Sequence, residues 1–445
     1  MGKPTAASQR AFQSWGRYPK SEPTRIVGIQ DRSSLPEFAG GKSTVLAYGQ
    51  GRSYGDVCLN NGGTLLSTSA LDRFINFDPD TGLLRAEGGT TLADVLVQTV
   101  PHGWFLPVSP GTKFISLGGA VANDIHGKNH HVAGTFGRHV TQFELVRSSG
   151  ERLICSPDRN TELFGATIAG LGLTGFITWV EFQLRPIESD QIDMTTTRFR
   201  SLDEFLSLSE AANEESPYVV AWIDGLRAEG RGLLMQGDHA PAGPGTSLPS
   251  TLPTRKARLS APFDAPGWLL NPFSIRAFNT AYFRKQIARV KRTRIHYDPY
   301  FYPLDAIRDW NRGYGKRGLL QYQCVVPFDD SNATVRELLS RIAGSGAGSF
   351  LAVIKTFGDI PSPGMMSFPR PGITLALDFA NKGERTIRFF HSLDAIVREA
   401  VGAVYPAKDA CMSGESFRAY FPRWEEFSTH IDPAFSSSFW RRVTS

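Results

Sequence analysis

Short apolar segments separated by glycine turns make up most of the first 187 residues. The segments 43–48, 64–67 and 83–87 have the length and the apolar content of strands. From 176 to 184, apolar side chains occupy alternate positions, which is the two-residue period of a strand with one buried face. The pattern therefore predicts several short strands joined by tight turns.

One helix and one hairpin are also predicted within these residues. Thr90 or Thr91 can cap the helix. Four side chains then share one face at three- and four-residue spacing, namely Leu92, Val95, Leu96 and Thr99. Further along, the segments 143–147 and 152–155 flank the turn Ser148-Ser149-Gly150, and this arrangement is typical of a hairpin.

The pattern changes after residue 187. A helix is predicted at 201–210, and strands are predicted at 218–223, 320–327, 350–357 and 372–379. We interpret 188–401 as a second domain built on an antiparallel sheet, in which the Pro-, Gly- and Ser-rich segment 238–267 is a mobile surface loop. The last residues, 402–445, are too aromatic for a tail, so we expect them to pack on the first domain, residues 1–187.

The composition is that of a mixed globular enzyme. At 445 residues the chain exceeds the size at which one hydrophobic core stops growing, and its 41% apolar content can fill two cores. The 44 glycines and 28 prolines show no repeating period, which favours many tight turns over a helical bundle or a disordered chain. We therefore expect an α+β fold with two domains.

Charge and cysteine usage exclude several classes of protein. Lys and Arg number 48 against 43 Asp and Glu, a surplus too small for a dedicated nucleic-acid-binding protein. The cysteines at 58, 155, 324 and 411 are far apart without metal-ligand spacing, so we expect reduced thiols. Since no secretory signal and no apolar run of about 20 residues is visible, we expect a soluble chain made in the cytoplasm.

The most informative segment is 48–56, which reads Tyr-Gly-Gln-Gly-Arg-Ser-Tyr-Gly-Asp and directly follows a predicted strand. Its three glycines permit backbone conformations that turn successive N–H groups toward one point, as a nest for anionic oxygens requires. Arg52 and Ser53 can add hydrogen-bond donors. A diphosphate fits such a loop, and a plain glycine turn is the alternative interpretation.

A second candidate region combines the glycine-containing segments 110–112 and 116–120 with a cluster of Asn, His and Lys at 123–131. The glycines allow the backbone to approach a flat ligand, and the cluster offers cationic and hydrogen-bonding groups for one reacting centre. Three histidines in six positions also suit a metal ion. No metal is predicted, because no acidic or cysteine ligand follows and the adjacent His130 and His131 would diverge in an extended chain.

The segment 170–175 spells GxGxxG, the letters of a Rossmann dinucleotide-binding loop. That fingerprint needs a strand before the loop and a helix after it. Here a helix-like stretch at 162–169 precedes the loop and the strand at 176–184 follows it. We therefore expect this loop to pass close to a cofactor held by the other two glycine regions.

In this order, the segments GQGRSYGD, PGT…LGGAVANDIHGKNHH and TELF…GLGLTG resemble the vanillyl-alcohol-oxidase type, or PCMH-type, FAD-binding domain. Within that superfamily, HGKNHH at 126–131, QYQCVVP at 321–327 and YPAKDA at 405–410 resemble the decaprenylphosphoryl-β-D-ribose 2'-oxidase family, the flavin subunit of a 2'-epimerase. The resemblance covers about residues 10–435. HGKNHH is highly specific, whereas GRSYGD is shared more widely.

The resemblance implies an FAD site in which residues 47–57 wrap the diphosphate. The cofactor-binding residues that it implies are Gly49, Gln50, Gly51, Arg52, Ser53, Tyr54, Gly55, Asp56, Gly111, Ser116, Leu117, Gly118, Gly119, Asn123, Asp124, Ile125, His126, Ile177 and Tyr405. Many relatives in the superfamily attach FAD through a histidine in the first loop. This chain has no histidine before His102, so we expect the flavin to be held without a covalent bond.

The resemblance also implies a set of polar groups around flavin and substrate, namely His126, Lys128, Tyr54, Gln323, Lys355 and Lys408, with Phe357 and Trp222 as apolar walls. Hydride transfer from a secondary alcohol to flavin N5 requires a base for the hydroxyl proton. Lys408 and His126 are both candidates, and Lys408 can instead stabilise the reduced flavin as a cation. Lys128, Lys355 and Gln323 suit a phosphate and sugar hydroxyls, although a single Lys is by default a solvated surface residue.

Two positions depart from the family pattern. Some members carry Asn-x-Cys where this chain has Thr374-Leu375-Ala376, so that amide and that thiol are missing here. Phe301 stands where a tyrosine can occur, which removes a hydroxyl. We therefore expect contacts to the sugar that differ from those of such members.

Between 267 and 294, aromatic and apolar residues precede and overlap a cluster of cations. The residues are Trp268, Leu269, Leu270, Phe273, Ile275, Phe278, Tyr282, Phe283, Arg284, Lys285, Arg289, Lys291, Arg292 and Arg294. Such a mixture suits a membrane interface with anionic headgroups, where a polyprenyl chain would dock. An ordinary core helix with a solvated basic face is the alternative.

The family resemblance implies an FAD-dependent oxidoreductase that converts the 2'-hydroxyl of a polyprenylphosphoryl-β-D-ribose into a 2'-keto group. That step is the first half of epimerisation to the arabinose donor for a cell-wall polysaccharide. A separate NAD(P)H-dependent reductase would complete it, and the enzyme would attach peripherally to the cell membrane. The alternatives are a soluble FAD-dependent sugar, alditol or aldonolactone oxidase, and a flavin-binding partner protein without catalysis.

Overall fold

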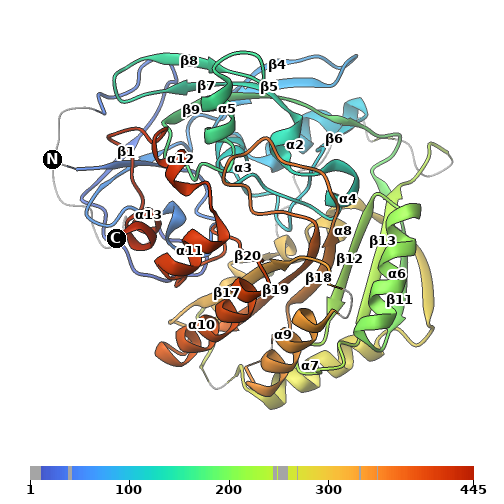
Figure 1. Ribbon diagram of the computed structural model, residues 1–445. Helices are drawn as coiled ribbons and strands as arrows, with labels where there is room; N and C mark the ends of the chain where they lie inside the picture. The colour runs from blue at the N-terminus through green and yellow to red at the C-terminus, as the bar shows by residue number, and fades with distance from the viewer. Residues whose placement is uncertain are drawn as a thin grey trace.

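The computed structural model describes residues 12–38, 43–243, 248, 259–267, 269–329, 332–347 and 349–445 (Figure 1). Two large β-sheets organise them, one in the upper and one in the lower half of Figure 1. Helices and sheets of this kind are an α+β architecture, as predicted.

The upper sheet has five strands in the order β4-β5-β9-β7-β8. They are β4 (Phe74–Phe77), β5 (Leu83–Glu87), β9 (Phe176–Gln183), β7 (Val140–Val146) and β8 (Arg152–Cys155). A smaller parallel sheet, in the order β1-β3-β2, holds β1 (Arg25–Gly28), β3 (Thr64–Ser67) and β2 (Val45–Tyr48). The predicted hairpin is confirmed, because β7 and β8 pair antiparallel across the turn at 148–150.

Short helices and loops fill the space below these sheets. They include α2 (Leu92–Thr99), α3 (Leu117–Ala122), α4 (His130–Ala133) and α5 (Thr161–Thr167). Thr91 caps α2, since its side chain accepts a hydrogen bond from the backbone N–H of Asp94. The GxGxxG loop lies between α5 and β9, so a helix precedes it and a strand follows it, as predicted.

The lower sheet has eight strands in the order β15-β11-β13-β12-β18-β19-β17-β20, and its neighbours pair antiparallel. They are β11 (Gln191–Phe199), β12 (Tyr218–Ile223), β13 (Gly232–His239), β15 (Val290–His296), β17 (Leu319–Val326), β18 (Ala352–Phe357), β19 (Gly372–Ala380) and β20 (Ala403–Val404). Its apolar face packs on three helices, α6 (Leu202–Glu215), α9 (Ala333–Gly344) and α10 (Glu384–Glu399).

The opposite face of the lower sheet turns toward the middle of the molecule. Tyr322 and Leu375 belong to the core shared with α9 and α10, whereas their neighbours Gln321, Gln323 and Ala376 line the central cavity. Successive side chains of a strand point to opposite faces, so packing of the apolar set aims the other set at the cavity.

The C-terminal residues return to the upper half and pack beside the loop after β2 (Figure 1). They form α11 (Gly414–Tyr420), α12 (Trp424–Ser428) and α13 (Ser438–Thr444). Arg442 of α13 forms ion pairs with Asp56 and Asp409, with nitrogen–oxygen distances of 2.8 and 2.9 Å. The division of the chain into domains at residues 187 and 401 stays a prediction.

Two expectations from the sequence need correction. Asp238 and His239 end strand β13, and Leu259–Ser260 forms β14, which pairs with β16 (Ile307–Arg308), so these parts of 238–267 are not loop. Residues 244–247 and 249–258 of the predicted mobile loop lie outside the described ranges. His130 and His131 are helical rather than extended, because they begin α4.

The remaining short elements border the cavity or the sheet edges. They are η1 (Asp56–Cys58), η2 (Val100–His102), β6 (Trp104–Phe105), η3 (Phe136–His139), β10 (Arg185–Pro186), α7 (Pro272–Arg284), α8 (Tyr297–Phe301), η4 (Pro303–Ala306) and η5 (Trp310–Tyr314). None of the helices in the described ranges combines the length and the apolar character needed to cross a bilayer.

The Arg442 ion pairs give a test of what holds the C-terminal segment in place. Asp56 and Asp409 are only 3% and 5% exposed, so Arg442→Ala leaves two carboxylates without their cation in a buried site. We expect the free energy of unfolding to fall by about 3 kcal/mol, the low end for such pairs because the guanidinium is 28% exposed. Urea unfolding followed by tryptophan fluorescence measures the change.

Arg423→Ala is the matched control, because Arg423 pairs with Glu426 at the surface, where both side chains are more than half exposed. That variant should unfold close to the wild-type midpoint. If Arg442→Ala did the same, the C-terminal segment would be held by apolar packing rather than by the ion pairs.

Candidate active site

A cavity of about 1220 Å³ lies between the upper and lower sheets. It is larger than the roughly 300–1000 Å³ of a site for one drug-sized ligand, which leaves room for a dinucleotide and part of a second molecule. Most of the predicted site residues line it, namely Gly49, Gln50, Gly51, Arg52, Ser53, Tyr54, Gly111, Ser116, Gly118, Gly119, Asn123, Ile125, His126, Lys128, Ile177, Trp222, Gln323, Lys355, Tyr405 and Lys408.

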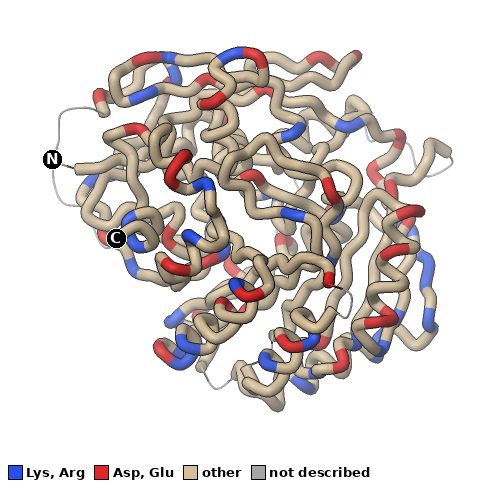
Figure 2. Tube along the Cα trace, in the orientation of Figure 1, with Lys and Arg blue, Asp and Glu red and all other residues tan. Residues whose placement is uncertain are grey.

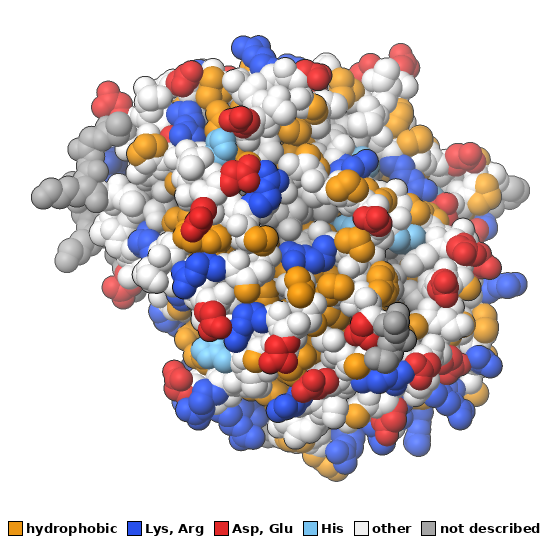
Figure 3. Space-filling view, viewed as in Figure 1, with side chains coloured by type: hydrophobic (Ala, Val, Ile, Leu, Met, Phe, Trp, Pro, Cys, Tyr) orange, Lys and Arg blue, Asp and Glu red, His pale blue; other side chains and the backbone are white. Residues whose placement is uncertain are grey.

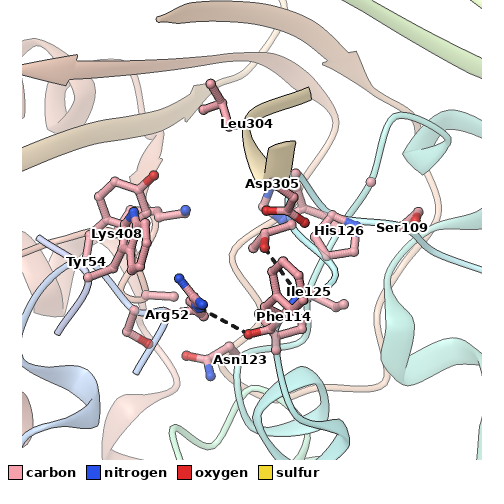
Figure 4. Close-up of a pocket in the computed structure, with 18 of the residues that line it drawn as sticks. Arg52, Tyr54, Ser109, Phe114, Asn123, Ile125, His126, Leu304, Asp305 and Lys408 are labelled. Atoms are coloured by element: carbon pink, nitrogen blue, oxygen red, sulfur yellow. Dashed lines mark hydrogen bonds between the residues drawn. The ribbon is translucent and has the colours of Figure 1, made fainter. Parts of the chain in front are cut away.

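The first glycine loop, which follows β2, forms one wall of this cavity. Gly51 has a φ of +60°, and a Cβ there would lie 2.1 Å from the hydroxyl oxygen of Tyr48, so only glycine fits. Arg52 is held in place with its guanidinium 4.1 Å from the ring centroid of Trp15, and its Nε donates to the backbone oxygen of Phe114 (Figure 4). The loop thus places backbone N–H groups and one cation together, as an anionic ligand requires.

The second glycine region forms the adjoining wall. The Ser116 hydroxyl accepts a hydrogen bond from the Gly119 N–H and caps α3. The amide nitrogen of Asn123 donates to the Gly119 oxygen, while its amide oxygen Oδ1 is buried without a partner among the described residues. Tyr405 donates its hydroxyl to the Asn123 carbonyl at 2.8 Å. This wall therefore offers small residues and an unused acceptor to a flat ligand with polar edges.

Five predicted residues do not line the cavity: Gly55, Asp56, Leu117, Asp124 and Phe357. Asp56 is paired with Arg442. Asp124 accepts from the Gly137 N–H and from the hydroxyls of Ser362 and Ser367, so it ties the β18–β19 loop to the upper half of the molecule. These residues support the walls of the cavity from behind.

His126 sits at the centre of the cavity wall, on the side away from Lys408 (Figure 4). Its Nε2 lies 2.8 Å from the amide nitrogen of Gln323, and its Nδ1 is buried without a partner among the described residues. The ring of Phe357 packs edge-on behind it with centroids 5.0 Å apart. Burial and the nearby Lys355 hold the pKa of His126 well below its ordinary value, so the imidazole is neutral.

Lys128 and Lys355 form a pair of half-buried amines on the same side. The Nζ of Lys128 donates to the Tyr300 carbonyl and lies 3.9 Å from the ring centroid of Tyr300. The Nζ of Lys355 donates to the Gly127 carbonyl at 2.8 Å. Burial lowers the pKa of each to about 7, and for Lys355 repulsion by Lys128 adds to the effect. An anion bound here would restore the charge of both.

Lys408 lies on the other side of the cavity, with its Nζ 3.8 Å from the ring centroid of Tyr54 (Figure 4). The two residues are brought together by the backbone, because the Tyr54 N–H donates to the Ala407 oxygen at 2.9 Å. A Cβ on Gly55 would lie 1.7 Å from the Asp409 oxygen, which explains the glycine at a position that does not face the cavity. The GRSYGD segment therefore positions a lysine as well as a ligand.

Burial lowers the pKa of Lys408 below its ordinary value, whereas the nearby carboxylate of Asp378 opposes that shift. The amine is therefore closer to a neutral, proton-accepting state than a surface lysine is. The cavity thus holds three lysines whose pKa burial lowers, and Lys408 stands apart from the other two, across from a neutral histidine.

Sequence reasoning missed several residues of the cavity. Gln321 lines it, and the two-residue period of β17 could have found it, because Gln323 lies two positions away on the same face. Residues 299–310 form a further wall that includes Asp305, and no local pattern indicates this. In the described part of the chain, no three His, Cys, Asp or Glu side chains gather as a metal ion would require.

Comparison with known proteins identifies the ligand of this cavity. A model of the FAD binding domain matches residues 35–156, which include both glycine regions that line the cavity. The glycine backbone, the Arg52 cation and the unused Asn123 oxygen fit such a ligand, and the cofactor is FAD.

One relative covers nearly the whole chain, and others cover parts of it. It is 33% identical, over 98% of its length and 97% of the relative, to the decaprenylphosphoryl-beta-D-ribose oxidase of Mycolicibacterium smegmatis. It is 32% identical, over 79% of its length, to an uncharacterised protein in the mprA 5' region of Streptomyces coelicolor, and 26% identical, over 46% of its length, to the L-gulonolactone oxidase of Bos taurus. The resemblance inferred from HGKNHH, QYQCVVP and YPAKDA is confirmed: the chain is an FAD-dependent oxidoreductase and belongs to the decaprenylphosphoryl-β-D-ribose oxidase family.

Proposed function

We propose that this enzyme oxidises the 2'-hydroxyl of a polyprenylphosphoryl-β-D-ribose to a 2'-keto group. The observation that carries the proposal is the division of one cavity into two parts, with Lys408 beside the flavin-binding loop and the amines of Lys128 and Lys355 on the far side. A substrate with an alcohol at one end and a phosphate at the other matches that division. The keto product would be returned to an alcohol of opposite configuration by a separate NAD(P)H-dependent reductase, which completes an epimerisation toward an arabinose donor for cell-wall polysaccharide.

FAD supplies the hydride acceptor when it is bound. We propose that it is held without a covalent bond. His126 is the one histidine among the described residues that line the cavity, and its Nε2 is already in contact with Gln323. The cysteine that lines the cavity, Cys58, has its pKa raised by burial to about 12, so its thiol stays protonated and unreactive.

Lys408 is the proposed base for the hydroxyl proton. A general base works best when its pKa lies near the working pH, and burial brings Lys408 toward that range. The imidazole of His126 is too weakly basic to hold the proton, and its contact with Gln323 suits it to orient the sugar hydroxyl. The alcohol carbon would lose a hydride while Nζ of Lys408 takes the proton, so that charge and electrons balance.

The proposed phosphate site is built from the half-buried amines of Lys128 and Lys355. Lys128 and Lys355 repel each other, and among the described residues their hydrogen bonds go to neutral carbonyl oxygens alone. A phosphate between them would satisfy both charges in a region of low dielectric. The missing amide and thiol at Thr374 and Ala376, on the neighbouring strand, leave fewer polar contacts for the sugar itself.

We also propose that the enzyme docks on an anionic membrane through α7 and β15. Phe273 and Ile287 are 82% and 90% exposed, so both large apolar side chains are accessible to a membrane surface. Around them lie five exposed cations with no ion-pair partner among the described residues, namely Arg276, Arg284, Lys285, Lys291 and Arg292. Lys and Arg follow edge strand β15 at the right of Figure 2. In Figure 3, cations interspersed with acidic side chains line the lower and right edges of the face.

The same surface borders the cavity. Tyr282 and Lys285 of the α7 region and Ile295 of β15 line it, so a lipid could pass from a bilayer to the cavity without crossing open water. Trp268, which the sequence placed in this surface, lies outside the described residues.

The FAD site is tested by Gly111→Ala. Gly111 lines the cavity, and a Cβ there would meet no protein atom within 4 Å, so the added methyl group collides only with a bound ligand. We expect FAD affinity to fall about tenfold, measured by flavin fluorescence quenching, while the apoprotein keeps its wild-type unfolding midpoint. Gly344→Ala, also in open space but away from the cavity, should leave the FAD affinity unchanged.

The reaction is tested by anaerobic mixing with polyprenylphosphoryl-ribose while the flavin absorbance is followed. We expect bleaching in the wild type and at least a hundredfold slower bleaching in Lys408→Met, because that variant lacks the base. The loaded flavin content should stay unchanged in the variant. Bleaching by free alditols or aldonolactones alone would contradict the lipid substrate, and wild-type rates in Lys408→Met would remove Lys408 as the base.

The membrane surface is tested by sedimentation with vesicles of zwitterionic lipid with or without anionic phosphatidylglycerol. We expect binding that requires the anionic lipid and that is lost in Lys291→Glu/Arg292→Glu and weakened in Phe273→Ser/Ile287→Ser. The double variant Arg25→Glu/Arg159→Glu changes the net charge equally at exposed positions outside this surface, and it should bind as the wild type does. Equal loss in that control would show that net charge alone drives binding.

A further inference from the structure

Asp378 is a buried carboxylate that the proposed reaction does not use. It lies on β19, is 1% exposed, and is paired in register with Gln321 of β17. Its Oδ1 accepts a hydrogen bond from the Gln321 amide at 2.5 Å, and its Oδ2 is buried without a hydrogen-bond partner among the described residues. A carboxylate in such a position needs a cation nearby to keep its charge.

The Gln321 amide joins Asp378 to the cavity wall, where the Nζ of Lys408 lies 3.8 Å from the ring centroid of Tyr54. Burial raises the pKa of Asp378, and the charge of Lys408 opposes that shift, although no direct hydrogen bond joins the two groups. Gln321 stands between Asp378 and the cavity, and it lines that cavity together with Lys408 and Tyr54. Asp378 therefore lies directly behind the wall on which the proposed base rests. Its position is fixed by the strand register rather than by a flexible loop.

We propose that Asp378 is a positioning residue that sets the charge state of Lys408. The inference deepens the proposed function, on which it rests for the role of Lys408. The negative charge of Asp378 favours the protonated amine, so it stabilises the ammonium group that forms when Lys408 takes the hydroxyl proton. Without Asp378, the buried amine would be neutral over a wider range of pH.

Other titratable groups also face this pair. They are Tyr54, Tyr314, His126, Arg52 and Lys382. Burial raises the pKa of both tyrosines, and Arg52 lies beside Tyr54. His126 lies across the cavity, and Lys382 shares a small cavity with Asp378. Neither tyrosine is ionised near neutral pH, and His126 carries no charge there. Asp378 is thus the carboxylate whose charge raises the pKa of Lys408.

The test is the substitution Asp378→Asn, which keeps the shape and can keep the contact with Gln321 while it removes the charge. Brief labelling of the flavin-loaded enzyme with acetic anhydride at a series of pH values, read by peptide mass spectrometry, reports the neutral fraction of Lys408. We expect the labelling midpoint of Lys408 to lie about one pH unit lower in the variant. Well below both midpoints, that shift makes labelling about tenfold faster.

The sign of the effect on catalysis follows from the same shift. The rate of flavin reduction should change with pH as Lys408 titrates. In Asp378→Asn, the midpoint of that change should move to lower pH, whether the neutral amine or the cation is the active form. The labelling experiment needs no substrate, so it can succeed or fail independently of the proposed reaction. An unchanged labelling midpoint would overturn the inference, and absence of bleaching in the wild type would overturn only the reaction.

Asp394→Asn is the matched control. Asp394 is equally buried, at 3% exposure, and accepts hydrogen bonds from the hydroxyls of Tyr322 and Tyr420 on the opposite face of the sheet. Burial raises its pKa to about 7, so its loss disturbs the protein in a similar way. It should leave the Lys408 midpoint at the wild-type value, and an equal shift in this control would mean that general loosening of the fold explains both.

A double variant covers the case in which Asp378→Asn does not fold. Lys408→Met/Asp378→Asn removes both charges, and we expect it to fold and to load flavin as Lys408→Met does. Failure of the double variant alongside a folded Lys408→Met would show that Asp378 serves packing and would contradict the inference.

Discussion

The site depends on the two-residue alternation of the central strands of the lower sheet. On β17, β18 and β19, one set of side chains packs with α9 and α10 in the core, and the set between them faces the cavity. A slip of one residue would exchange the two sets. Burial of the core set therefore makes the side chains of Gln321, Gln323 and Lys355 point into the cavity. Apolar packing on one face of these strands thus determines where the polar groups on the other face lie.

Burial of positive charge is the second consequence of this design. Lys128, Lys355 and Lys408 all border the cavity, and in each case burial lowers the pKa of the amine. Such an arrangement destabilises the protein without ligands, because the amines of Lys128 and Lys355 have no ion-pair partner among the described residues in a medium of low dielectric. The same arrangement favours anionic ligands strongly. A dinucleotide and a sugar phosphate would supply the missing negative charge, so their binding would offset the excess of positive charge in the cavity walls.

Much of this could be predicted from the sequence, and the residues show why. Strands such as 64–67, 83–87 and 218–223 were found at their observed bounds because their apolar pattern is local. The HGKNHH motif identified the family, and the predicted lysines do meet in one cavity. Asp378 and, apart from Phe301, the wall at residues 299–310 were not found, because their roles arise from strand register and from chain segments far apart in sequence. The loop at 238–267 was partly misjudged, since strand pairing with residues 307–308 overrides its turn-forming composition.

The proposed base and the flavin loop belong to one structural unit, although they are some 350 residues apart in the chain. Lys408 follows β20, and its neighbour Ala407 accepts the Tyr54 N–H, while Gly55 admits the Asp409 backbone at a distance that no side chain would allow. Arg442 then joins Asp56 to Asp409 from outside. Any shift of the GRSYGD loop that weakens FAD binding must therefore also displace Lys408. The flavin site and the proton-accepting group cannot be assembled separately, which explains why the C-terminal segment has to return across the whole molecule to the loop after β2.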